Sequence, residues 1–451
     1  MTLPNDLNDL SKGELIRIIY DQHDRIIALE TQLAELQSQI KKQGPKNSEP
    51  LPSWVKPNVQ RRKKTLRKQR EEGYARTLDM PTKQVFHSCS VCPSCGGALG
   101  KPVVSYTRQT IDIPHTPVDI TEHVVCKRWC ATCRTQVAPQ LDLSGIVVGQ
   151  QRFGVRLMSM VAMFKEAFRQ PVTTIQSYFE ILHSLHLSRG EIIALLHTTA
   201  SRGKPTYEGL QHQLRMSPVV YGDETGGREN GINGYTWNFN TDRIKVLLYR
   251  HTRSQTVVTE VLGEEFEGVL VSDFYAAYNV YAGFHQRCWV HYVRDIKKLN
   301  ELYPKDIRLR RWTRKIHTLY HQAKAWPGPD PTLSKGRKEQ VRIAKQRAFE
   351  EQLKTLCQPW ILQDVPMSTL SARAIKFLPE MFTFIRFEGV ASDNNSAERS
   401  VRHTVIARKI SGGTRSANGS ETKSILGSLF GTWKLQNLNP LEQCQLLLAQ
   451  G

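Results

Sequence analysis

Three acidic residues in the second half of the chain occupy positions where acids can bind metal ions. Asp223 closes a short apolar run that starts at Ser217, Asp273 closes a similar run from Gly268, and Glu398 lies in a polar stretch of helical period. Short apolar runs bounded by Gly or Pro are typical of buried strands, and acids at their ends meet at a sheet edge. Three carboxylates gathered there suit Mg²⁺ or Mn²⁺, because these ions prefer hard oxygen ligands. Two such ions could activate a nucleophile and stabilise the leaving oxygen of a phosphodiester.

The helix expected to carry Glu398 starts shortly before it. Ser392 or Asp393 can cap the first turn, since a short side-chain oxygen accepts the free N–H groups there. Four residues at spacings of three and four then share one face: Glu398, Val401, Arg402 and Val405. Two neighbouring acids, Glu224 and Asp393, remain alternatives to the residues named above.

A second group of potential metal ligands precedes the acids. Two Cys-x-x-Cys pairs, with 34 residues between them, are Cys92 with Cys95 and Cys130 with Cys133. Paired thiolates of this spacing suit tetrahedral Zn²⁺, and the ion would supply folding free energy on the order of 10 kcal/mol. Residues 108–113 and 119–125 alternate as strands do, so a stretched zinc ribbon is predicted. Cys89 and Cys126 could compete as ligands, although their spacing is less suitable.

The overall charge favours a polyanionic partner. The 451 residues carry a formal net charge of +20, and the pI is near 9.6. We find no apolar run long enough to span a bilayer and no signal peptide, so we expect no membrane association. Nine cysteines without an export signal argue against a disulfide framework. The expected location is the cytoplasm, in association with the nucleoid.

The N-terminal residues 12–42 are expected to form a coiled coil. Eight residues step by four and three along one seam: Leu15, Ile19, Gln22, Ile26, Leu29, Leu33, Leu36 and Ile40. This seam predicts a homodimer or a higher oligomer. A helix packed on its own protein is the alternative.

A basic linker over residues 43–80 follows. Eight basic residues and no acid lie between Lys56 and Arg70. Six of them are expected to neutralise DNA phosphates, the alternative being a solvated tail: Arg61, Arg62, Lys63, Lys64, Arg67 and Lys68.

Residues 150–212 have a helical pattern with one break. Ser188 and Glu191 form a capping-box pattern that would begin the second helix of a helix-turn-helix, although many such pairs merely pack. From residue 217 the expected order is the strand ending at Asp223, strands at 234–240 and 243–250, a helix at 256–262, the strand ending at Asp273, and a fifth strand at 285–291. The long separation from Glu398 is expected to be an α-helical insertion over about residues 300–388.

From Cys92 onward the chain resembles the insertion sequence 66 family of bacterial transposases. The motifs that carry the resemblance follow the family's order and are Cys92–Cys95, Val118–Val124, Gly222–Gly226, Val271–Tyr278, Cys288–His291, Asp393–Arg399 and Arg408–Arg415. The resemblance implies an α/β fold whose catalytic core, residues 217–451, is RNase H-like with the helical insertion. The coiled coil, the zinc-ribbon domain (81–145) and the helical DNA-binding region would precede this core.

The family's activity implies a DDE triad of Asp223, Asp273 and Glu398 that uses Mg²⁺ or Mn²⁺. Such an enzyme cleaves the ends of its element in double-stranded DNA and joins them to a target. Basic residues near the acid of the helix would contact the DNA: Arg399, Arg402, Arg408 and Lys409. Some family members need accessory proteins of the same element.

Two features leave alternatives open. Cys288 and His291 resemble a motif of several DDE transposases and either steady the acidic site, contact flipped DNA or form a buried structural pair. These two residues alone are too few to hold zinc. The rival functions are an RNase H-like nuclease without strand transfer and a DNA-binding remnant of an element.

Overall fold

The computed structural model describes residues 79–113 and 117–450, together with part of the segment 11–32. The chain divides into two compact units, Met1–Asp112 and Ile113–Gly451. In the first unit, residues 21–26 and 28–32 are helical, and the seam residues Ile26 and Leu29 are exposed. The rest of the seam, and the basic run from Arg61 to Lys68, lie outside the described residues. The coiled coil and the basic linker therefore stay predictions.

A mixed five-stranded sheet forms the centre of the second unit. Its strands are β3 (Val219–Glu229), β4 (Ile232–Asn240), β5 (Lys245–Arg250), β6 (Val269–Ser272) and β7 (His285–Arg287). Their spatial order is β5-β4-β3-β6-β7, with β3, β4 and β5 antiparallel and β6 and β7 parallel to β3. The helix α5 (Thr256–Leu262) connects β5 to β6 and has the predicted bounds. The expected sequence of strands and helix is thus confirmed.

Two strand boundaries differ from the prediction. The strand β3 does not end at Asp223 but continues to Glu229, because the hairpin partner β4 pairs with it from Tyr221 to Glu229. The strand β7 ends at Arg287, and Cys288 is the N-cap of a helix, so the predicted strand over 285–291 is wrong in its second half.

Helices from both ends of this unit pack on the sheet or on one another. They are α2 (Val155–Glu166), α3 (Val172–His183), α4 (Arg189–Arg215), α11 (Asn395–Ser411), α12 (Ala417–Leu435) and α13 (Pro440–Ala449). The predicted capping box starts α4: the Ser188 hydroxyl accepts the Glu191 N–H, and the Glu191 carboxylate accepts the Ser188 N–H. One hydrophobic core contains residues of α4, of the sheet and of α12, for example Ile192, Trp237 and Ile425. The helical region 150–212 therefore packs into the same core as the sheet.

The helix α12 covers the outer edge of β5, which is the first strand in the order of the sheet. The backbone N–H groups of Lys245 and Leu247 donate to Thr432 Oγ1 and Ser428 Oγ, at 3.0 and 2.8 Å. Side-chain hydroxyls thus satisfy strand amides that would otherwise be open to another chain.

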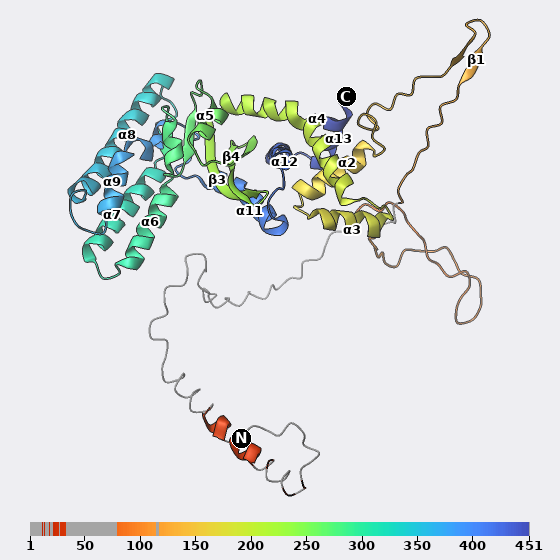
Figure 1. Cartoon of the computed structure of the whole chain (residues 1–451), viewed down its shortest axis with the longest axis horizontal. Coiled ribbons are helices and arrows are strands. Elements are labelled where there is room, and N and C mark those ends of the chain that lie inside the picture. The colour runs from red at the N-terminus through yellow and green to blue at the C-terminus, as the bar shows by residue number, and fades with distance from the viewer. Residues whose placement is uncertain are drawn as a thin grey trace. The chain divides into compact units, whose positions relative to one another are not determined.

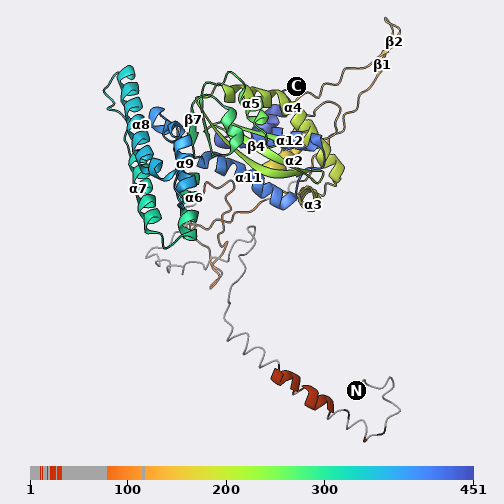
Figure 2. The same cartoon turned by 60° about the vertical axis from the view of Figure 1, so that its left-hand side comes forward.

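The predicted insertion is helical and has its own hydrophobic core, but it begins at Trp289 rather than at about residue 300. It contains α6 (Trp289–Leu302), α7 (Ile307–Lys324), α8 (Lys335–Cys357), α9 (Ser368–Lys376) and α10 (Thr383–Arg386), with single 3₁₀ turns at Gln358–Trp360 and Pro379–Met381. Trp289, Trp312 and Phe382 lie in this second core. In two views α6, α7, α8 and α9 stand together on one side of the sheet, while α11 runs along a sheet face (Figures 1 and 2).

The predicted zinc-ribbon strands are not found. In the described part of residues 108–125 there is neither helix nor strand, and side chains such as Ile111 and Ile120 are exposed. Alternation alone produces no sheet there, because no partner buries the apolar side. A short hairpin, β1 (Arg128–Cys130) with β2 (Thr135–Val137), carries the second cysteine pair. Among the described helices, none has both the length and the apolar character that crossing a bilayer requires.

Candidate active site

The register of two parallel strands aligns the two aspartates. Val219 to Tyr221 of β3 pair with Val269 to Val271 of β6. The same register, continued by two residues, sets Asp223 beside Asp273. Because neighbouring strands are about 4.8 Å apart, the two carboxylates leave the sheet close together. Asp223 thus lies in the middle of its own strand, yet just beyond the stretch that pairs with β6.

Asp273 is held from two sides. Its Oδ1 accepts the backbone N–H of Tyr275 at 2.8 Å, and its carbonyl oxygen accepts Arg287 Nη1 and Ser272 Oγ, each at 2.9 Å. This arrangement fixes both the backbone and the carboxylate of the residue that follows β6.

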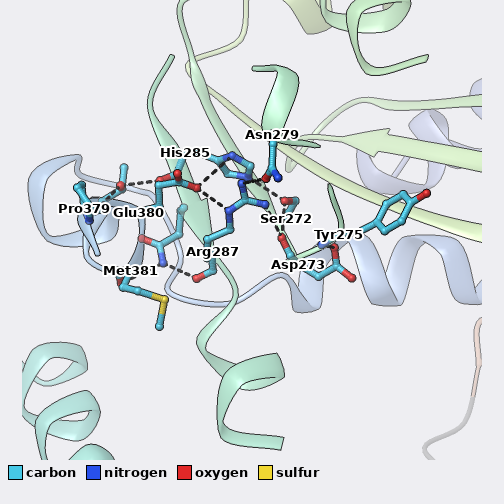
Figure 3. Close-up of polar contacts among 11 residues, drawn as sticks. Ser272, Asp273, Tyr275, Asn279, His285, Arg287, Pro379, Glu380 and Met381 are labelled. Carbon is cyan, nitrogen blue, oxygen red and sulfur yellow. Dashed lines mark hydrogen bonds and ion pairs between the residues drawn. The ribbon is translucent and has the colours of Figure 1, made fainter. Parts of the chain in front are cut away.

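The guanidinium of Arg287 is buried and fully engaged. Only 1% of the residue is exposed, and its other nitrogens donate to Glu380 Oε2 at 2.5 Å and Asn279 Oδ1 at 2.6 Å (Figure 3). The ring of Phe377 lies 4.5 Å from the guanidinium carbon. Sequence reasoning missed this residue. The available signal was a run of three polar residues, His285 to Arg287, in a segment expected to be a buried strand.

Glu398 is brought to the aspartates by α11. The N-cap of this helix is Asn394, not Ser392 or Asp393 as predicted, although Asp393 Oδ1 accepts the first-turn N–H of Asn395 at 3.2 Å. The reason is tertiary: Asn394 Nδ2 donates to the carbonyl of Gly222 at 2.7 Å, which ties the start of α11 to the residue before Asp223.

Polar contacts seat α11 on the sheet. Asn240 Nδ2 donates to Ser396 Oγ at 2.9 Å, and Ser400 Oγ donates to Asn238 Oδ1 at 2.8 Å. The buried ammonium of Lys245 donates to the Ser400 carbonyl at 2.9 Å. Glu398 lies in the first turn between these anchors, so its backbone position is determined by the sheet.

The charges of Asp273 and Glu398 both act on the carboxylate of Asp223. Burial, followed by the negative charge of Glu224, raises the pKa of Asp223 to about 7, and the charges of Asp273 and Glu398 add to this increase. The Glu224 N–H, which donates to Asp223 Oδ1 at 2.9 Å, acts in the opposite direction. A bound divalent cation would relieve this repulsion. Three hard oxygen donors in such an environment fit Mg²⁺ or Mn²⁺.

The two alternative acids, Glu224 and Asp393, form hydrogen bonds and ion pairs with other residues. Strand alternation turns Glu224 to the face opposite Asp223. There its carboxylate accepts Arg253 Nε at 2.9 Å and the Tyr278 hydroxyl at 2.6 Å, and its side chain is 3% exposed. The Asp393 carboxylate accepts the Asn395 N–H at 3.2 Å and lies 3.6 Å from Lys324 Nζ.

The predicted DNA contacts on α11 divide into two groups. Arg399, Arg402 and Lys409 are exposed, whereas Arg408 is half-buried and donates to Thr225 Oγ1 at 3.3 Å. Exposure of Arg402 also separates it from the buried Val401, with which it was expected to share a face.

The glycine turn after α11 packs against the sheet. Thr414 N–H donates to the Arg228 carbonyl at 2.9 Å, and Asn230 N–H donates to the Thr414 carbonyl at 2.8 Å. A Cβ on Gly413 would come within 2.1 Å of the Arg228 oxygen, so this position requires glycine. The Thr414 N–H of this turn therefore binds the protein's own backbone.

Each cysteine pair forms a turn that favours thiolates. In the first unit, Gly96 N–H donates to the Cys92 carbonyl at 2.8 Å, and N–H groups of Ser94 and Cys95 at the sulfur lower the pKa of Cys92. In the second unit, Cys133 N–H donates to Cys130 Sγ at 3.5 Å and lowers the pKa of that thiol. Thiolates are the form that binds zinc, so both pairs suit this ion.

Comparisons with known proteins agree with these features. Residues 90–134, which include both cysteine pairs, match the zinc-finger binding domain of transposase IS66. Over 385 residues the chain is 22% identical to the uncharacterized protein y4jD of Sinorhizobium fredii (strain NBRC 101917 / NGR234), covering 77% of this chain and 72% of that protein. Residues 150–422, which include Asp223, Asp273 and Glu398, match the model described as Transposase IS66 family. Since this last match spans more than half of the sequence, the chain belongs to the IS66 family of transposases.

Proposed function

We propose that the protein is a DDE transposase with an RNase H-like core. In this proposal Asp223, Asp273 and Glu398 hold Mg²⁺ or Mn²⁺, and the enzyme cuts the ends of its insertion sequence and joins them to target DNA. The observation that carries the proposal is the convergence of three carboxylates from β3, the end of β6 and α11. The strand order β5-β4-β3-β6-β7, with three antiparallel strands followed by a helix and two parallel strands, supports the core assignment.

The reaction has two phosphoryl-transfer steps. In the first, a water oxygen bonds to phosphorus at the element's end, the bond to the 3′-oxygen breaks, and a free 3′-hydroxyl results. In the second, this hydroxyl attacks a target phosphodiester and releases a new 3′-hydroxyl, so one ester replaces another. The bound ions would supply a nucleophile of lowered pKa and neutralise charge on the phosphate. The protein's own part is to orient the carboxylates, and no Ser or Tyr nucleophile is needed.

The DNA partner would be held by basic residues around this site. Arg399, Arg402 and Lys409 lie exposed on the helix that carries Glu398 and would contact phosphates, as would the N-terminal run from Arg61 to Lys68. We extend the proposal to the helical region 150–212 as a further DNA contact. Binding to the chromosome would place the protein at the nucleoid.

Zinc and oligomerisation complete the proposal. Cys92, Cys95, Cys130 and Cys133 would hold one structural Zn²⁺, supported by the thiolate-stabilising turns and by the match of residues 90–134. The N-terminal seam would join two or more chains, so that one complex could hold both ends of an element.

Labelled DNA carrying the element's own end, incubated with Mg²⁺, Mn²⁺ or chelator, tests this function. Asp223→Asn, Asp273→Asn and Glu398→Gln should each abolish cleavage and keep end binding. Asp393→Asn is the matched control and should keep cleavage, because its carboxylate is engaged by Asn395 and Lys324. Cleavage retained in any of the first three variants removes that residue from the triad.

The same assay separates the rivals. Cutting with joined product supports the transposase, and cutting without joining supports the nuclease. Binding without cutting, in every metal, would support the DNA-binding remnant.

A further inference from the structure

Three side chains outside the pair of aspartates meet at the junction of α6 and α11. Cys288 is the fully buried N-cap of α6, His291 lies one turn later, and Glu398 lies in the first turn of α11. The Cys288 sulfur, one His291 ring nitrogen and one Glu398 oxygen all lie within 4.8 Å of one another. These donors are a sulfur, a nitrogen and an oxygen, whereas the three carboxylates offer only oxygen.

The distance between His291 and Glu398 is too long for a hydrogen bond and fits two ligands of a common ion. His291 Nδ1 lies 3.6 Å from Glu398 Oε1. A direct hydrogen bond between an imidazole and a carboxylate would measure about 2.7–2.9 Å. Two ligands that share a tetrahedral zinc, at bond lengths near 2.0 Å, lie about 3.3–3.6 Å apart. The observed separation therefore corresponds to the second case.

Two buried polar atoms at this junction lack a hydrogen-bond partner. Within the described part of the chain, His291 Nδ1 and Glu398 Oε1 are both buried and neither has a hydrogen-bond partner. Buried polar atoms normally have a partner, so two orphans facing each other require an explanation. Arg294 Nη2 also lies 3.6 Å from Glu398 Oε1, but this side chain is 46% exposed and can turn away to solvent.

The two helix starts are locked together around the sulfur. Asn394 N–H donates to Cys288 Sγ at 3.1 Å, and Trp289 N–H donates to the Ser392 carbonyl at 3.0 Å. Burial raises the pKa of the Cys288 thiol to about 11, and the Asn394 N–H acts against this increase. The junction thus presents a sulfur ligand in a fixed position.

We propose that Cys288, His291 and Glu398 bind a zinc ion through Sγ, Nδ1 and Oε1. Thiolate and imidazole favour zinc over the magnesium or manganese expected at the three carboxylates. The thiol releases its proton to solvent as the ion binds. Three protein ligands leave the fourth position for water or a phosphate oxygen. The ion would fix one oxygen of Glu398 and leave the other for the catalytic metals; this consequence, unlike the site itself, rests on the proposed function.

Metal content of the full-length protein provides the test. After equilibration in a zinc buffer containing excess Mg²⁺, elemental analysis should find one zinc per chain fewer in Cys288→Ser and in His291→Gln than in wild type. Cys357→Ser is the matched control, a buried cysteine at the end of α8, and should keep the wild-type content. Equal zinc in wild type and both site variants would overturn the inference. His291→Gln gives an independent result where Cys288→Ser fails to fold.

Cobalt distinguishes this ion from the zinc of the two cysteine pairs. In a protein carrying Cys95→Ser and Cys133→Ser, bound Co²⁺ should give a thiolate-to-cobalt charge-transfer band that disappears when Cys288→Ser is added. No band in the first variant, or an unchanged band in the second, contradicts the proposal. These readouts need no DNA: a second zinc in a protein that cleaves nothing supports the site and refutes the proposed function.

Discussion

Replacing Arg287 by methionine tests how the site holds Asp273. The substitution keeps an unbranched apolar stem but removes donors to the Asp273 carbonyl, Glu380 and Asn279. Breaking a buried ion pair costs about 3–5 kcal/mol. Glu380 is 30% exposed, so water can solvate its carboxylate, and we expect a loss of about 2–4 kcal/mol of stability.

The effect on catalysis should exceed the effect on folding. Ser272 Oγ still donates to the Asp273 carbonyl at 2.9 Å, so the strand end keeps one support and shifts without unfolding. A displacement of about 1 Å at a reacting centre costs on the order of 10²-fold in rate. We therefore expect end cleavage to fall by roughly 10²-fold at a temperature where the variant remains folded.

Urea unfolding followed by tryptophan fluorescence gives the stability difference, and the DNA-end assay gives the rate. Arg308→Met is the control: this arginine is 62% exposed and lies 3.9 Å from Asp306, so its loss should cost less than about 0.5 kcal/mol. A double-mutant cycle with Glu380→Gln should give a coupling of about 1–3 kcal/mol. Additive single effects, or wild-type stability in Arg287→Met, would refute the reasoning.

Three further predictions follow from individual contacts. Burial lowers the pKa of His403 to about 4, so its contribution to stability is complete above the unfolded pKa of about 6.5 and is lost as the pH falls toward 4. His403→Gln should reduce the loss of unfolding free energy between pH 7 and 4.5 by about 1–2 kcal/mol. An unchanged pH dependence of stability would contradict this prediction. Gly413→Ala should lower the melting temperature, because its Cβ meets the Arg228 carbonyl, whereas Gly336→Ala in the open first turn of α8 should not; equal melting points would disprove the contact. A thiophilic chelator should increase proteolysis within residues 90–134 of wild type, and Cys95→Ser should show this cleavage without chelator; a segment that is equally resistant in all three samples would argue against structural zinc.

Local patterns predicted much of this protein correctly. The order of strands and helix from residue 217, the bounds of α5 and the capping box of α4 all depend on periodicity and on contacts within one or two turns. The two Cys-x-x-Cys turns are equally local, since each sulfur receives N–H groups from its own loop. Such features are visible in the sequence because the residues that interact are neighbours along the chain.

Long-range contacts decided what the sequence left open. Asp223 and Glu224 are adjacent and chemically alike, and only the pairing of β3 separates them, because it sends one side chain toward α11 and the other to Arg253 and Tyr278. The N-cap of α11 is Asn394 rather than a predicted residue, since the Asn394 side-chain amide donates to the Gly222 carbonyl, 172 residues away.

The same limit applies to Cys288 and His291. Their spacing suggested a pair too small to hold a metal, and the third donor, Glu398, arrives from a helix more than a hundred residues later. The sequence by itself thus determined which chemical groups the protein has and the elements that carry them. Register and packing determined which of those groups meet, because such contacts depend on residues too far apart for any local pattern to relate them.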